Sequence, residues 1–260
     1  MTARHTLLLR LVGPMQSWGY RSRFEDRDTG LEPTRSGVLG LLASAYGVSR
    51  EDTETLANWD ARLRMGIRVE VPAKRFSKSV ATGFRVESDF HTAQNVYRAS
   101  GGTRAETVLS TRHYLADARF TAGLESEDLE LLKSLEQALK SPVWTLSLGR
   151  KSFPLSIPPW LPNKRGIREE TRLLEALQSA PWLLLHDRET IPREIPFVLE
   201  PDADFPTEFD TSKAIPMRMA DRPLDFEARR FGLRQTMRLQ RSLGECKERG
   251  MEEDRCFCLK

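Results

Sequence analysis

The residues in this sequence best suited to acid–base chemistry are two histidines near the middle of the chain. His91 and His113 lie in a polar stretch, and Tyr114 follows the second histidine. Metal-free RNA cleavage needs a general base for the 2′-hydroxyl, a general acid for the leaving oxygen and a cation beside the phosphate. These side chains and nearby arginines or lysines offer such groups. However, a histidine in a basic segment more often binds or stacks on RNA, so binding is the favoured interpretation and cleavage the alternative.

The sequence contains no motif typical of a metal or cofactor enzyme. It lacks H-E-x-x-H, a P-loop, a dinucleotide fingerprint and a G-x-S-x-G elbow, and its four histidines are scattered. The three cysteines near the C-terminus could bind metal, but their spacing matches no common zinc pattern. We therefore expect no cofactor, no metal and no catalytic residue. The cysteines are Cys246, Cys256 and Cys258.

Two clusters of basic residues could bind phosphate. One surrounds the expected N-terminus of a helix, whose amides also attract phosphate, and the other flanks a Pro-rich loop. Aromatic rings near both clusters could stack on bases. A net charge of +3 decides little, and Glu25, Asp26 and Asp28 would oppose phosphate in the first cluster. The basic residues are Arg21, Arg23, Arg27 and Arg35, then Arg150, Lys151, Lys164 and Arg165; the rings are Trp18, Tyr97, Tyr114 and Trp160.

The elements that must position these residues follow from the apolar pattern. Thr34 or Ser36 can cap the first helix, Gly47 suits the left-handed turn at its end, and Ser49 with Asp52 has capping-box spacing for the second helix. We expect, in order, a strand at 6–13, helices at 36–47 and 49–63, a strand at 66–71, a polar arm at 73–113, a strand at 114–125, a helix at 126–140 capped by Ser126 and a strand at 144–149.

Without the arm, this is the split β-α-β order of a ferredoxin-like or RRM-like domain in the α+β class. The arm carries seven basic residues against three acids and is predicted to form a projecting hairpin. Beyond it we expect a Pro-rich loop at 149–166, a helix at 168–178 and strands at 182–187, 196–201 and 230–241. The predicted division is a body at 1–150, a smaller β-rich region at 151–241 and a charged, disordered tail at 242–260.

The strand at 230–241 nearly alternates between apolar and basic residues. Phe231, Leu233, Met237 and Leu239 are predicted to face inward. Arg230, Arg234 and Arg238, with Gln240, would then face outward. The result is either a rail for phosphates or a solvated edge strand.

The protein is expected to be soluble and cytoplasmic, without membrane contact. The N-terminal apolar run is short, is interrupted by Arg10 and is followed by no signal cleavage site. The longest weakly polar run, at 37–48, is too short to span a bilayer. An odd number of cysteines without a secretory signal also suggests reduced thiols in a cytosol.

Several motifs together resemble the CasD family, the family-five CRISPR-associated subunits of type I-E Cascade complexes. The resemblance spans most of residues 5–157, with a weaker match near FGLRQTMRL and none in the tail from about 242. It rests on LRLVGPMQSWG, PTRSGVLGLLASAYGVSRED, ATGFRVESDFHTAQNVYR, TRHYLADARFTAGL and PVWTLSLGRKSFPLS.

This resemblance implies an RRM-like body with a β-hairpin thumb, placed at the 73–113 arm. It implies a non-catalytic subunit that caps the crRNA, holds its 5′ repeat-derived handle and packs against the terminal backbone subunit and the large subunit. Target DNA would be met indirectly, through the complex. In another subtype the relative cleaves precursor RNA, so a metal-independent endoribonuclease is the alternative, and a pure interaction protein is the third hypothesis.

The residues proposed to bind RNA combine the basic clusters with this resemblance. Arg35 and Ser36 would hold phosphate, and Gln16 and Trp18 would line the same end of the sheet. The thumb residues would grip RNA or brace the thumb against the backbone subunit, while the remaining arginines and lysine would add charge. The thumb set is Arg85, His91, Arg98, Arg104, Arg112 and His113; the others are Arg21, Arg150, Lys151 and Arg234.

Overall fold

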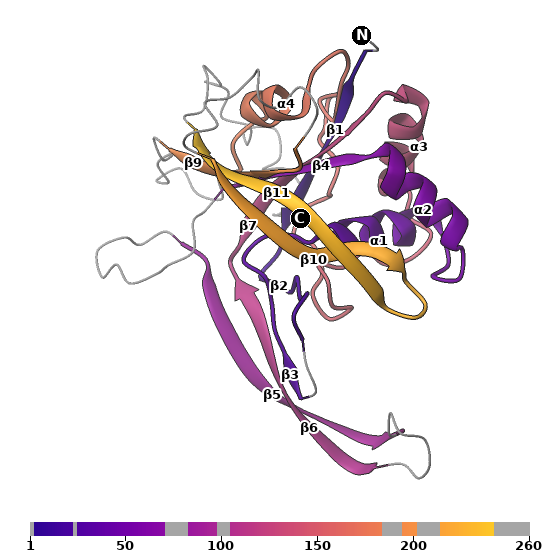
Figure 1. The fold of residues 1–260 in the computed structure, drawn as a ribbon, viewed down its shortest axis with the longest axis vertical. Coiled ribbons are helices and arrows are strands. Elements are labelled where there is room, and N and C mark those ends of the chain that lie inside the picture. Colours follow the sequence, from indigo (N-terminus) through magenta and orange to yellow (C-terminus); the bar gives the residue numbers. More distant parts are fainter. Residues whose placement is uncertain are drawn as a thin grey trace, which may run out of the picture.

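A computed structural model describes residues 3–22, 25–70, 83–97, 105–183, 194–201 and 214–241. The fold is mixed α+β with mostly antiparallel sheets (Figure 1). A seven-stranded sheet has the order β10-β11-β9-β4-β7-β1-β8. Its strands are β1 (His5–Val12), β4 (Arg64–Val69), β7 (Arg119–Ser126), β8 (Ile167–Arg168), β9 (Ile195–Leu199), β10 (Ile215–Asp225) and β11 (Arg230–Arg241).

Helices cover both faces of this sheet. All eight residues of β1 are buried, and alternate side chains of a strand point to opposite faces. Leu7, Leu9 and Leu11 join the larger core with residues of three helices, while Leu8 packs in a second core with the fourth helix. The three helices are α1 (Arg35–Tyr46), α2 (Thr53–Arg62) and α3 (Leu129–Lys140), and the fourth is α4 (Leu173–Ser179).

The predicted caps of the first helix are confirmed. The Thr34 hydroxyl accepts a hydrogen bond from the Gly37 amide, and Gly47 adopts a left-handed φ of 82°. The other two caps differ by a few residues from the prediction. Asp52 caps α2 and Asp128 caps α3, because each carboxylate accepts from an amide of the first helical turn.

The predicted strand at 144–149 is wrong. The amides of Val143 and Trp144 bond to carbonyls at the end of α1, and the Leu148 amide bonds to Phe153 within a turn. The segment therefore cannot pair with the sheet, and β8 lies beside β1 instead. Of the predicted strand at 182–187, the first two residues are not in a strand and the rest lies outside the described residues.

The predicted orientation of the last strand is also wrong in its first half. Leu233 is 67% exposed, whereas Arg234 is buried. The apolar row of β11 faces the same side of the sheet as α4. Only the C-terminal end of this row is covered, because Leu239 packs in the core that contains α4. The arginine row faces α1 and α2, where acids of the protein bind it.

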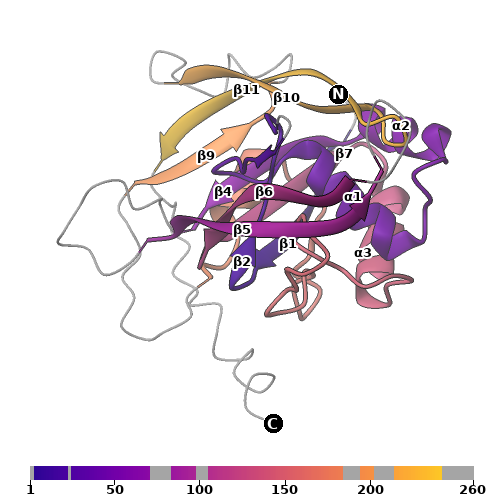
Figure 2. The same ribbon diagram turned by 90° about the horizontal axis from the view of Figure 1, so that it is seen from below.

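A second sheet is built on a long hairpin that projects from the body (Figure 1). Strands β5 (Arg85–Val96) and β6 (Ala105–Ala116) pair antiparallel along their length. Two short strands, β2 (Met15–Gln16) and β3 (Asp26–Arg27), pair with β6 near the body. Figure 2 shows the molecule from below, with β10 and β11 along one side of the body and the turn that joins them beside α2.

The C-terminal strands continue the main sheet, because β9 pairs with β4 and β11 pairs with β9. The division at residue 150 therefore coincides with no break in the sheet and remains a prediction. The tail at 242–260 lies outside the described residues. Among the helices described, none is both long and apolar enough to cross a membrane.

Candidate nucleic-acid interface

The loop between β1 and α1 reaches the root of the projecting hairpin. Met15 and Gln16 pair with the end of β6, and Arg27 lies opposite Arg112 in a short parallel ladder. These contacts place a basic loop beside a basic strand, although more than eighty residues separate them in the sequence. The corner that they form is the candidate interface.

Three arginines meet at this corner: Arg27, Arg112 and Arg150. Arg150 Nη2 donates to the carbonyl oxygens of His113 at 3.0 Å and Arg27 at 3.4 Å. Burial and the nearby positive charge of Arg112 lower the pKa of Arg150, while the charge of Asp89 opposes this effect. A bound phosphate would reduce the repulsion between cations that are held together in this way.

Two aromatic rings support the arginine cluster. The Arg150 guanidinium lies 5.4 Å from the centre of the Phe153 ring, and that ring lies 5.8 Å from the ring of Tyr114. Tyr114 and Arg112 are on the same face of β6, since they are two residues apart. The cluster therefore combines cations with aromatic surface on one face of the hairpin.

Gly149 has a packing role at this corner. Its φ is 90°, and a Cβ atom there would lie 1.8 Å from the carbonyl oxygen of Ser17. Only glycine allows the loop to approach Ser17 so closely. Lys151, which follows Arg150 in the chain, is exposed.

The acidic residues of the loop hold it in place. Asp26 lies 3.1 Å from His113 Nε2, and Asp28 accepts hydrogen bonds from the Arg21 amide and the Ser22 hydroxyl. The Arg21 guanidinium stacks over the ring of Tyr20, 4.9 Å from its centre. Asp26 therefore braces the loop against the hairpin and Asp28 holds the loop to itself, roles that the sequence does not reveal.

The structure places Gln16 and Trp18 in the interior, not on the predicted RNA-facing edge. Both are buried. Gln16 Nε2 donates to the carbonyls of Leu11 and Ala118, and Trp18 Nε1 donates to Gln16 Oε1. Their polar atoms already have partners, so these side chains tie the loop to the body.

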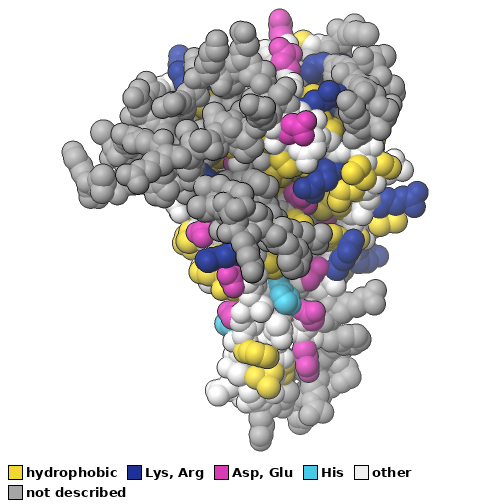
Figure 3. All heavy atoms as spheres, turned by 90° about the vertical axis from the view of Figure 1, so that its left-hand side faces the viewer, with side chains coloured by type: hydrophobic (Ala, Val, Ile, Leu, Met, Phe, Trp, Pro, Cys, Tyr) yellow, Lys and Arg dark blue, Asp and Glu magenta, His cyan; other side chains and the backbone are white. Residues whose placement is uncertain are grey.

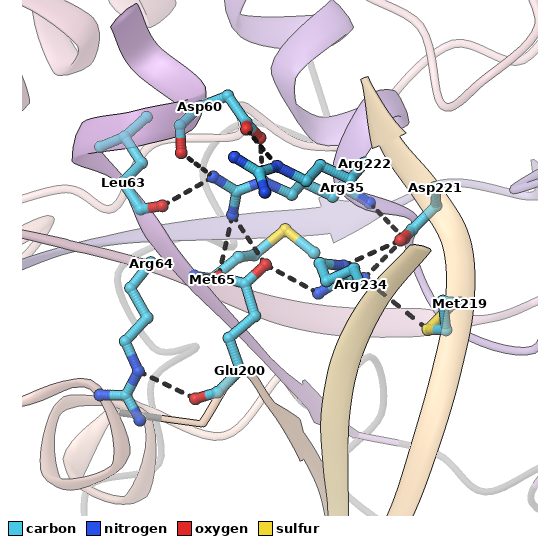
Figure 4. A network of polar contacts seen from close by, with 10 residues as sticks. All are labelled: Arg35, Asp60, Leu63, Arg64, Met65, Glu200, Met219, Asp221, Arg222 and Arg234. Carbon is cyan, nitrogen blue, oxygen red and sulfur yellow. Dashed lines mark hydrogen bonds and ion pairs between the residues drawn. The ribbon is translucent and has the colours of Figure 1, made fainter. Parts of the chain in front are cut away.

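Arg35 is also internal, contrary to its predicted phosphate role (Figure 4). It is 4% exposed, and its guanidinium donates to Asp60 Oδ1 and to both oxygens of Glu200. It also donates to the carbonyls of Asp60 and Leu63. The α1 amide of Arg35 is occupied too, because it donates to Asp221 Oδ2 at 2.8 Å. A carboxylate of the protein thus takes the place at the helix N-terminus that was predicted for a phosphate.

Arg234 belongs to the same network (Figure 4). It donates to both oxygens of Asp221 and to Glu200. Burial alone would lower the pKa of Arg234, but the bonds and charges of Asp221 and Glu200 outweigh it, so the pKa is raised. Arg222, which lies on β10, donates a hydrogen bond to Asp60 Oδ2. The network fastens β10 and β11 to α1 and α2.

The remaining predicted residues are spread along the hairpin and α1. Arg85 is exposed and pairs with Glu87, His91 is exposed, and Ser36 is partly buried in the first turn of α1. Arg98 and Arg104 lie outside the described residues. The structure thus brings together Arg112, His113, Arg150 and Lys151. It joins to them Arg27 and Tyr114, which the sequence indicated as basic and stacking candidates, and it adds Phe153, which the sequence did not indicate.

Comparison with known proteins agrees with this architecture. The family model described as CRISPR-associated protein (Cas_Cas5) matches residues 6–236. The chain is 37% identical over 161 residues to the CRISPR system Cascade subunit CasD of Escherichia coli (strain K12), covering 61% of this chain and 70% of that protein. A solved CRISPR RNA-guided surveillance complex contains a chain with a TM-score of 0.66 and 28% identity, covering 92% of this chain and 90% of that one.

A crystal structure of a Cas protein is similar as well, with a TM-score of 0.63 and 34% identity over 92% of this chain and 95% of that one. The α+β fold and the basic corner beside a projecting hairpin thus occur in a chain that is similar to proteins of CRISPR systems. The chain belongs to the Cas5 family of CRISPR-associated proteins.

Proposed function

We propose that this protein is a non-catalytic subunit of a type I-E Cascade complex that binds the 5′ repeat-derived handle of crRNA. The observation that carries the proposal is the meeting of Arg27, Arg112 and Arg150 at the root of the hairpin, in a member of this family. Its relatives are described as a Cascade subunit and as part of an RNA-guided surveillance complex. The setting is the cytoplasm, in antiviral defence.

The topology supports a ferredoxin-like or RRM-like body with the hairpin as its thumb. Strands β1 and β4 both pair antiparallel with β7, and α1 and α2 connect them, as in a split β-α-β unit. The hairpin is inserted between β4 and β7. In this proposal the thumb and the body also contact the terminal backbone subunit and the large subunit, and target DNA is met through the complex.

The placement of the two histidines supports a binding role over RNA cleavage. In the hairpin register His91 lies opposite Ser110, and His113 lies opposite Ser88. Because 110 and 113 differ by an odd number, the two histidine side chains point to opposite faces. They therefore do not form one acid–base pair across a single phosphate.

The test is a binding titration of the full chain with labelled handle RNA. Arg112→Ala with Arg150→Ala is expected to weaken binding and to reduce the salt dependence, by a slope of about 0.7 for each phosphate that the protein no longer neutralises. Arg230→Ala, which removes an exposed cation at the far end of β11, is the matched control. Unchanged affinity in the double variant would contradict the proposed site.

A second measurement addresses the absence of catalysis. Labelled repeat RNA is incubated with the protein in EDTA, and the products are separated by size. We expect intact RNA. A product ending in a 2′,3′-cyclic phosphate, lost on replacing His91 or His113, would show an endoribonuclease instead.

A further inference from the structure

A cleft opens at the end of the main sheet that lies away from the projecting hairpin. The hairpin adjoins β4 and β7 where Val69 pairs with Phe120, and at the other end of the same two strands Arg64 pairs with Glu125. The cleft lies at this second end, between the C-terminal turn of α2 and β11, and has a volume of about 360 Å³. That volume is within the range of small-ligand sites in proteins. The cleft is therefore large enough for a small ligand and is separate from the basic corner at the hairpin root.

Arginine dominates the lining of this cleft. Six arginines line it, against two acids, Asp60 and Glu200. They come from distant parts of the chain, so only folding brings them together. Figure 3 shows several arginine or lysine side chains along the right-hand side of the body, where β10 and β11 lie. The six arginines of the cleft are Arg4, Arg35, Arg62, Arg64, Arg222 and Arg234.

Two of these arginines lie deep in the cleft and are neutralised by the protein. Arg35 and Arg234 are buried. Asp60 and Glu200 bind Arg35, and Asp221 and Glu200 bind Arg234 (Figure 4). A ligand would therefore bind nearer the mouth of the cleft.

Acids also stand at the rim of the cleft, beside two of its outer arginines. Arg4 pairs with Glu125 and Glu127, and Arg62 pairs with Asp128. These pairs already balance part of the positive charge at the mouth. Arg4 and Arg62 would therefore contribute less to binding an anion than an arginine whose terminal nitrogens are not engaged.

Arg222 is the arginine of the cleft best placed to bind a ligand. Its side chain is 52% exposed, and within the described part of the chain its guanidinium bonds through Nε alone, to Asp60 Oδ2 at 2.8 Å. The two terminal nitrogens of a guanidinium can together bind two oxygens of one oxyanion. Gln235, exposed on β11, also lines the cleft and offers an uncharged amide donor.

The lining favours a compact oxyanion over a nucleic-acid strand. Among the described residues of the lining none is aromatic, whereas single strands are held by stacked bases as well as by cations. Glu127 and Asp128 would repel a strand that carries a charge at every nucleotide. A terminal phosphate group carries about 1.5 to 2 negative charges at neutral pH and three acceptor oxygens. It therefore gains more from Arg222 than a carboxylate group would.

We propose that this cleft binds one terminal phosphate group, either inorganic phosphate or the phosphate end of a nucleotide, with Arg222 as its principal ligand and Gln235 beside it. Asp60 binds Arg222 and Arg35 together, so the buried network holds Arg222 in position. The cleft is a second anion site at the opposite end of the sheet from the proposed RNA site, and it does not depend on RNA binding.

The test is a calorimetric titration of the full chain with inorganic phosphate in a chloride buffer. Gln235→Glu places a negative charge in the cleft and leaves the arginine network unaltered. Gln240→Glu makes the same change at an exposed position of β11 outside the cleft and is the matched control. Phosphate affinity is expected to fall at least about fivefold in the first variant and to stay within about twofold in the control.

Variants of Arg222 test its role as the principal ligand. Arg222→Met is expected to weaken phosphate binding at least about tenfold. Arg222→Lys should recover part of this loss, because lysine keeps the charge but not the paired donors.

Competition experiments identify the source of the phosphate group. Displacement of bound phosphate by adenosine 5′-monophosphate would assign the cleft to the end of a nucleotide, and phosphate binding without such displacement would assign it to inorganic phosphate. Displacement by an oligonucleotide with a 5′-hydroxyl end, which carries only internal phosphodiesters, would overturn the inference. The absence of saturable phosphate binding, or equal affinities in the two glutamate variants, would overturn it as well.

Discussion

Replacing Arg35 with methionine tests whether this arginine acts in the interior or on RNA. Its guanidinium is buried, and the facing carboxylates of Asp60 and Glu200 are buried or nearly so. Removing one partner from a buried ionic network costs about 3–5 kcal/mol. Arg222 and Arg234 would still hold one acid each, so the network would not be left without cations. Two backbone carbonyls would nevertheless lose their donors, and the expected loss is about 3 kcal/mol or more.

A loss of this size is a large part of the roughly 5–15 kcal/mol that stabilises a typical domain. The assay is urea denaturation followed by tryptophan fluorescence and circular dichroism, with the midpoint and slope fitted for each protein. Arg62→Met is the control, because it breaks an exposed pair with Asp128 and should cost about 0–1 kcal/mol.

Handle binding is then measured under conditions where both variants are folded. We expect Arg35→Met to bind RNA as the control does. A free energy of unfolding within about 1 kcal/mol of the control, together with a clear loss of RNA affinity, would refute the internal role and restore the phosphate role of Arg35.

Three further predictions concern stability. Arg68→Met should cost about 3–5 kcal/mol in urea denaturation, because Arg68 is fully buried, pairs with Glu70 and donates to carbonyls at the end of α4; a loss below about 1 kcal/mol would contradict this. Gly149→Ala should lower the free energy of unfolding by at least about 1 kcal/mol because of the left-handed φ alone. Gly40→Ala, where there is open space in α1, should raise it by about 0.5–1 kcal/mol. Equal changes in the two variants would refute the argument. Hydrogen bonds from the backbone amide and the side chain of Thr55, in the first turn of α2, hold the pKa of Asp52 below its usual range. The contribution of Asp52 to stability is therefore present above about pH 4 and is lost as the pH falls through the lowered pKa. Asp52→Asn should flatten the acid limb of a stability–pH curve, and an unchanged limb would count against the cap.

Local sequence predicted much of the fold. The strand at β1, the helices α1, α2 and α3, and the turn at Gly47 all follow from apolar spacing and capping residues. These features depend on residues a few positions apart, which act on one another whatever the rest of the chain does. The basic, polar composition of the 73–113 arm likewise indicated a projecting element, and β5 with β6 forms one.

The partners of charged side chains could not be predicted in this way. The sequence predicted Arg35 and Arg234 as phosphate ligands, yet both bind Glu200, which follows β9 and is 165 and 34 residues away from them in the chain. Arg234 also binds Asp221 on the neighbouring strand β10. The same limit applies to β11. The sequence correctly predicted that its apolar and basic residues alternate, but it did not predict which of the two rows faces solvent. A period fixes which residues share a face, whereas the elements that cover that face are fixed only by packing.

The sequence by itself therefore determined the kinds of most elements and the family to which the chain belongs, because both are recorded in local spacing and motifs. Tertiary structure alone decided which cations are available to a ligand. Arg112 and Arg150 meet at the hairpin root only because the loop after α3 folds against β6, where Arg150 donates to the His113 carbonyl, whereas Arg35 is neutralised within the body. The physical reason is that the role of a charge depends on the charges around it in space, and folding brings these together from distant parts of the chain.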